Sequence, residues 1–184
     1  MAEDLDAETK LELYKLVISR YRDLINQNES RSISEIRQMV SPYNDFIRKM
    51  REKMLSDIVP YDYRNHFFTA VERAISYIRT VRTCQFAFTF WMSFEEIDKL
   101  KIAGPMDKAI FLAALIRSFE SADARVIVTK KGRNFVKFSW KDNHYLISPE
   151  SGSLLSGEDS MKLFSDDPIA YSFSDLAYEN FEEV

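Results

Sequence analysis

The stretch GPMDKAIFLAALIRSF, residues 104–119, constrains the fold more than any other part of the chain. Gly104 interrupts the preceding segment, and Pro105 suits the first turn of a helix because it has no N–H to leave unpaired. Residues 109–116 are apolar on every face of the helix that follows. A helix without a polar face has to be buried, so we predict a central helix from Pro105 to about Phe119.

The chain before this helix is predicted to be helical. Apolar residues recur at helical spacing in Leu13–Ile25, in Ser34–Val59 with a break at Ser41-Pro42, and in Arg64–Thr83. Ser93 is followed three residues later by Glu96, which is the pattern of a capping box at the start of a further short helix.

After the central helix the pattern changes to short runs rich in β-branched and aromatic residues. We predict strands at Ala124–Thr129, Asn134–Trp140 and His144–Ser148, joined by turns tight enough to make neighbouring strands antiparallel. A short helix around Asp159–Phe164 and a strand at Ile169–Phe173 are expected further on. The fold class is therefore α+β, with N-terminal helices, a central buried helix and an antiparallel sheet of at least three strands.

The length of 184 residues predicts a single domain spanning residues 1–184. Within it we expect a helical N-terminal extension at 1–60, a core at 61–155 and an acidic C-terminal segment at 156–184. From Glu150 onward nine acidic residues accompany one basic residue, whereas the whole chain carries a net charge of −4. The remainder is too evenly mixed in charge to predict binding to nucleic acid.

The sequence also bears on location. The first ten residues are acidic and carry no apolar stretch, which excludes a signal peptide there, and the apolar run at 109–116 is too short to cross a membrane. The single cysteine, Cys84, excludes an intramolecular disulfide. We therefore expect a cytoplasmic protein that does not bind membranes. The oligomeric state is left open.

Few residues have the chemistry of a catalyst. The only histidines are His66 and His144, and His66 is too far from Cys84 along one helix to activate it. Cys84 and His144 remain a potential nucleophile–base pair across the fold. The simpler interpretation is that Cys84, close to Phe86 and Phe88, is a buried apolar thiol.

The order of motifs from about Phe90 to Gly152 resembles the core of the transglutaminase-like superfamily, particularly its microbial members. That pattern runs from a Trp and a Glu-rich short helix to a Gly-x-Cys segment opening a buried helix, and then to three strands. Its matching segments here are Trp91, Glu95-Glu96, Gly104–Ala109, Ala124–Ile127, Asn134–Phe138 and Tyr145–Pro149.

The resemblance implies a Cys-His-Asp triad, and this sequence departs from it at all three positions. Met106 occupies the Cys position, and a thioether has no ionisable proton with which to start acyl transfer. Asn134 occupies the His position and Ser148 the Asp position, so the implied site lacks a base and a charge to orient it. We therefore expect a pseudoenzyme rather than an enzyme.

Three functions remain in competition. The first is binding of a protein or peptide through the remnant cleft, lined by Trp91, Met106, Asn134 and Ser148, unless the cleft has collapsed into core. The second is a hydrolase or acyltransferase that uses Cys84 and His144. The third is a Ca²⁺-binding module, because several animal members of the superfamily that the chain resembles are calcium-dependent. Its candidate ligands are Glu158, Asp159, Asp166 and Asp167. No other cofactor is expected.

Overall fold

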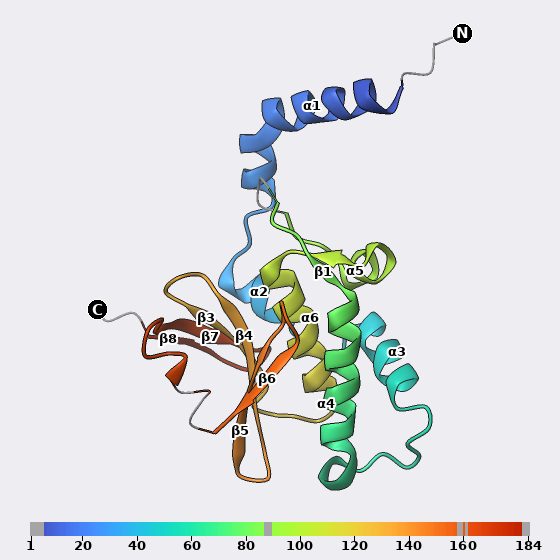
Figure 1. Cartoon of the computed structure of the whole chain (residues 1–184), viewed down its shortest axis with the longest axis vertical. Coiled ribbons are helices and arrows are strands. Elements are labelled where there is room, and N and C mark those ends of the chain that lie inside the picture. Colours follow the sequence, from blue (N-terminus) through green and yellow to red (C-terminus); the bar gives the residue numbers. More distant parts are fainter. Residues whose placement is uncertain (1–5, 87–89, 158–159, 161, 182–184) are drawn as a thin grey trace.

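The computed structural model describes residues 6–86, 90–157, 160 and 162–181. A helical layer and an antiparallel sheet enclose one long helix, α6 (Pro105–Ser118). In Figure 1 the sheet covers one side of α6, and the helices α3 (Asp45–Met54) and α4 (Tyr63–Thr80) cover the other. The predicted α+β class, with a central buried helix, is confirmed.

The helix α6 is buried over most of its length, as its composition requires. Ala109 to Phe119 are almost entirely buried except for Arg117, which pairs with Asp175 at 2.7 Å. The Phe111 ring contacts Phe46, Tyr77 and Phe94, with ring centroids 4.8–6.0 Å apart. These rings come from α3, α4 and α5 (Phe94–Leu100), so α6 holds the helical layer together.

The other helices begin where the sequence pattern indicates. The helix α5 has the predicted capping box, in which the Ser93 hydroxyl accepts the Glu96 N–H and the Glu96 side chain accepts the Ser93 N–H. The helix α2 (Ile33–Met39) has a second capping box, between Ser32 and Glu35. The helix α3 ends at Met54, several residues before the predicted end at Val59.

The main sheet contains six antiparallel strands among the described residues, in the order β6-β5-β4-β3-β7-β8. The predicted strands are present as β3 (Arg125–Thr129), β4 (Asn134–Trp140), β5 (Asn143–Ser148) and β7 (Ile169–Phe173). The strands β6 (Ser153–Ser156) and β8 (Tyr178–Asn180) extend the sheet at its two edges. A separate parallel pair, β1 (Arg82–Thr83) and β2 (Ile102–Ala103), ties the end of α4 to the start of α6. The predicted helix at Asp159–Phe164 lies partly outside the described residues.

One hydrophobic core runs through most of this structure. Its buried residues extend from Val40 in the expected N-terminal extension to Phe173 in the expected acidic segment. A smaller cluster of Ile127, Phe135 and Leu146 lies on the opposite face of the sheet. The core is therefore continuous across the expected segment boundaries at residues 60 and 156.

The helix α1 (Ala7–Asn28) stands away from this core. Figure 1 shows it projecting from one end of the molecule, and none of its residues is buried. Its apolar side chains are largely exposed: Leu11, Leu13, Tyr14, Leu16, Val17, Ile18, Tyr21 and Leu24.

Removing residues 1–28 is therefore expected to change the free energy of unfolding by less than about 0.5 kcal/mol, as for surface changes generally. Denaturant unfolding of the truncated and full chains measures this. As a matched control, Phe111→Ala in the core should cost about 3–5 kcal/mol. If truncation lowered the free energy of unfolding by more than about 1 kcal/mol, the apolar side of α1 would have to be buried in a contact in solution.

Candidate functional site

The first turn of α6 places Met106 at the edge of the core. Gly104 is the N-cap, without a side-chain hydrogen bond, and Pro105 is the first helical residue. A Cβ atom on Gly104 would lie 2.9 Å from Asp107 Oδ2, so any other residue here would have to displace this carboxyl group. Met106 is partly buried against the core with its thioether in this turn, where unpaired N–H groups would favour a thiolate if a cysteine stood there.

A hollow of about 190 Å³ opens beside this turn. It is lined by Phe86, Phe90, Trp91, Gly104, Pro105, Met106 and Asp107. The rings of Phe86 and Phe90 meet almost at right angles, with centroids 5.6 Å apart. Two of the four residues predicted to line a cleft, Trp91 and Met106, therefore border a hollow at the start of α6.

Trp91 is held in place by a residue far away in the sequence. Its indole N–H donates to the Glu29 carbonyl oxygen at 2.9 Å, and its backbone N–H donates to Glu29 Oε2 at 3.3 Å. Glu29 is the C-cap of α1, so the projecting helix is anchored at the wall of the hollow. A second hollow of about 540 Å³ also includes Trp91. Its lining residues are Arg31, Glu35, Gln38, Met39, Asn44, Trp91, Met92, Ser93 and Glu96.

Asp107 is the charged residue that lines the smaller hollow. Its side chain is only 3% exposed, and among the described residues its Oδ1 has no hydrogen-bond partner. Burial raises the pKa of Asp107 to about 7, and the nearby Glu29 carboxylate adds to the rise. Backbone N–H groups of Met92 and Gly104 donate to the carboxyl group and oppose this change without cancelling it.

Asn134 lies at the end of the sheet that is nearest to the first turns of α6. The ammonium group of Lys108, one turn into α6, donates to the Glu150 carbonyl at 3.2 Å, just beyond the end of β5. Because β4 and β5 are antiparallel, the start of β4 is at that end too. Asn134 shares its sheet face with Val136 and Phe138, which pack in the main core, and its buried Oδ1 is without a partner in the described part of the chain.

The strand register does not direct Ser148 to the same face. Ile147 pairs with Val136 and packs in the main core, whereas Leu146 belongs to the cluster on the opposite face. Side chains alternate along a strand, so Ser148 points with Leu146, away from α6. The assignment of Ser148 to a third site position is thus not supported by the register. Of the predicted site residues, Trp91 and Met106 line the smaller hollow, whereas Asn134 is buried and does not line it.

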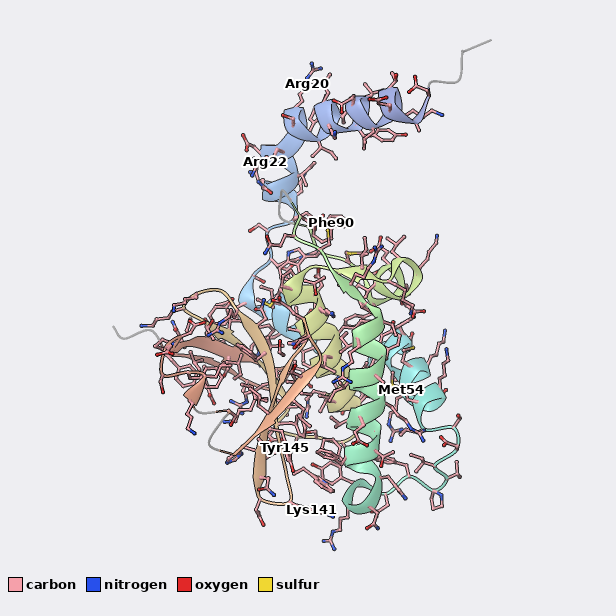
Figure 2. The ribbon with its side chains drawn as sticks, viewed as in Figure 1. Arg20, Arg22, Met54, Phe90, Lys141 and Tyr145 are labelled. Carbon is pink, nitrogen blue, oxygen red and sulfur yellow. The ribbon has the colours of Figure 1, made fainter. Side chains whose placement is uncertain are left out.

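The pairing of Cys84 with His144 does not form. Cys84 is half-buried rather than buried, and its N–H donates to the Ala103 carbonyl just before the start of α6. His144 is near the tip of the β4–β5 hairpin, where its Nδ1 lies 2.9 Å from the Ser139 hydroxyl. Tyr145 contacts Phe68 near the start of α4, whereas Cys84 follows the end of α4, roughly 18 Å along the helix axis. Figure 2 shows Tyr145 and Lys141 at the end of the molecule opposite Phe90.

The expected calcium ligands do not converge either. Asp167 is fully buried, and it accepts from Arg133 Nε at 2.7 Å and from the Lys131 N–H at 2.9 Å. Burial alone would raise the pKa of Asp167, but hydrogen bonds from Thr129, Arg133 and Lys131 outweigh it and lower that pKa to about 2. Asp167 thus closes the β3–β4 turn. Glu158 and Asp159 lie outside the described residues, within which no three His, Cys, Asp or Glu side chains, Asp166 included, gather as a metal site.

Sequence reasoning missed Glu29, Phe86 and Asp107 as residues of the site. Asp107 follows Met106 directly and had a signal available, because it stands in the first turn of a helix that the sequence already predicts to be buried. The sequence held no such signal for Glu29, because 62 residues separate it from Trp91.

Comparison with known proteins agrees with this architecture. The solved structure of calcium-bound LapG from Legionella pneumophila superimposes with a TM-score of 0.55 at 12% identity, covering 83% of this chain and 90% of LapG. At that identity the likeness concerns the fold alone. No protein-family model and no curated protein matches the chain. None of the helices in the described residues is long and apolar enough to cross a membrane.

The burial of Asp107 generates a prediction about pH. The pKa of Asp107 is about 7 in the folded chain and near 3.9 when unfolded, so the folded state holds an extra proton between those values. Stability is then lost as pH rises through this window. Asp107→Asn does not titrate and should gain stability over the wild type, by about 1–3 kcal/mol between pH 4.5 and pH 8.

Asp98→Asn is the matched control, with the opposite sign. Hydrogen bonds from Lys101 and then Tyr77 lower the pKa of Asp98, so its contribution is present at neutral pH and is lost as the solution becomes acidic. Because the pKa of Asp98 lies below its ordinary value, that loss occurs at pH values below this range, and the difference between Asp98→Asn and the wild type should not change between pH 4.5 and pH 8. Denaturant unfolding across the range measures both variants. If the difference between Asp107→Asn and the wild type were independent of pH, Asp107 would not be a buried acid.

Proposed function

We propose that this chain is a non-catalytic transglutaminase-like protein that binds a peptide segment of another protein at the hollow beside Met106. The observation that carries the proposal is the first turn of α6, where a thioether stands beside an open hollow walled by aromatic rings. A thioether cannot form an acyl-enzyme, so this turn has the position of a nucleophile without its chemistry.

The other nucleophile of the chain does not replace it. Cys84 is half-buried near Gln85 and Ala103, and the imidazole that would have to activate it is bonded to Ser139 at the far hairpin. Nucleophilic catalysis by a cysteine needs an adjacent general base, a role that His144 cannot fill from that hairpin. We therefore infer that no amide is hydrolysed or transferred here through a covalent thioester.

The lining of the hollow suits contact with a peptide. Methionine is unbranched and polarizable, so it adapts to different side chains, and aromatic residues are enriched at the centres of protein interfaces. Trp91 borders both hollows, one mainly apolar and one lined by polar and charged residues. An extended segment that crosses Trp91 would place neighbouring side chains in the two hollows.

The calcium alternative has less support. LapG was solved with calcium, but its likeness to this chain is one of fold. In this chain Asp167 is fully buried and accepts hydrogen bonds from Arg133 and Lys131, so it is not available to a cation.

Peptides selected from a displayed random library on the wild-type protein should bind Met106→Gln at least about fivefold more weakly. The substitution keeps the length of the side chain but leaves an amide to be desolvated in an apolar contact, which costs about 1 kcal/mol. Fluorescence anisotropy of the labelled peptides gives the dissociation constants.

Met54→Gln makes the same change on α3, away from the hollow, and should leave the affinity unchanged (Figure 2). The bound peptides should also remain intact on prolonged incubation with the protein. Peptides that bind equally well to Met106→Gln, or that are cleaved by the wild type but not by Cys84→Ser, would contradict the proposal.

A further inference from the structure

The smaller hollow combines aromatic walls with one buried acid, Asp107, whose Oδ1 has no hydrogen-bond partner among the described residues. Phe86, Phe90 and Trp91 present rings around it, and Asp107 is its charged lining residue. The perpendicular arrangement of Phe86 and Phe90 forms a corner between the two rings. The electron-rich face of an aromatic ring attracts a cation that lies within about 6 Å of its centroid.

In the part of the chain that the structure describes, no cation pairs with the carboxyl group of Asp107, although a buried acid normally has one. The charged side chain that perturbs its pKa is another acid, Glu29, and its Oδ1 has no hydrogen-bond partner among the described residues. The nearest lysine in sequence, Lys108, is directed to Thr83 and Glu150 instead. Buried charges are usually paired, so the first turn of α6 lacks a positive charge beside Asp107.

The partial positive charge at the N-terminus of α6 does not fully balance the carboxylate of Asp107. The N-terminus of α6 carries the equivalent of roughly half a positive charge, which is less than the charge of even one ionised carboxylate. The two acids therefore leave the surroundings of the hollow negative when they are ionised. Together with the ring faces, this potential favours a cation over a neutral or acidic group.

We infer that the hollow takes an arginine side chain of the bound partner segment, with its guanidinium against the rings of Phe86, Phe90 or Trp91 and one N–H directed to Asp107. A guanidinium suits this place better than an ammonium because it is planar, stacks on aromatic faces and is more weakly hydrated. This assignment rests on the proposed function, and it names the residue that the partner contributes.

The test uses N-acetyl-arginine amide and its neutral isostere N-acetyl-citrulline amide, titrated into the ¹⁵N-labelled protein at constant chloride concentration. The chain has two tryptophans, and their indole N–H signals report separately on the hollow and on a distant reference site. Trp140 is a suitable reference because Lys141 Nζ already lies 4.2 Å from its ring centroid. We expect a saturable shift of the Trp91 signal with arginine, at least tenfold weaker binding of citrulline, and no saturable shift at Trp140.

Two variants make the assignment specific to Asp107. Asp107→Asn should weaken the binding of the arginine derivative about tenfold, because it removes the charge and keeps the shape, whereas Asp98→Asn on α5 should not change it. Equal binding of arginine and citrulline, an absence of binding, or an unchanged affinity in Asp107→Asn would overturn the inference. Library peptides that bind through Met106 but show no preference for arginine would overturn it and leave the proposed function intact. Arginine binding without any recovered peptide would support the inference and count against the proposed function.

Discussion

The burial of α6 on all sides is the constraint on which the rest of the structure depends. A helix whose residues 109–116 are all apolar exposes a large hydrophobic surface unless other elements cover it, at a cost of about 25 cal/mol for each Å² left in water. The sheet covers one side of it, and α3, α4 and α5 cover the other through the rings around Phe111. The order of the layers therefore follows from this one helix.

The same constraint explains why the candidate site lies at the start of α6. Its first turn carries two charged residues, Asp107 and Lys108, into an environment that is otherwise apolar. Lys108 finds partners in Thr83 and Glu150, and these contacts join α6 to the strand β1 and to the turn after β5. Asp107 Oδ1 finds none in the described part of the chain, so the two sides of the turn are unequal. Burying an acid without a partner costs free energy. We therefore attribute the lack of a partner for Asp107 Oδ1 to the binding of a ligand and not to the packing of the core.

Local patterns were sufficient for much of the fold. The helix α6, the capping box of α5 and the strands β3, β4, β5 and β7 were predicted because their signals lie within short windows of sequence. The small strands β1, β2 and β8 were not, since two or three residues are too few to form a pattern.

The site was harder to predict because its contacts are long-range. The face on which Ser148 lies depends on pairing with β4, the partner of Asp167 is 34 residues away, and Glu29 reaches Trp91 across 62 residues. Met106 and Asn134 came from their place in a motif, whereas Ser148 shows that a motif position does not fix the direction of a side chain.

The central claim is that the first turn of α6 is a binding surface, and the methyl signals of the seven methionines test it most directly. The protein labelled with ¹³C at the methionine methyl groups is titrated with a peptide selected against it. The account predicts that the Met106 signal shifts and saturates with the peptide, while the signal of Met54 on α3 stays in place. Saturation of the other methionine signals with Met106 unmoved would place the peptide elsewhere and contradict the account.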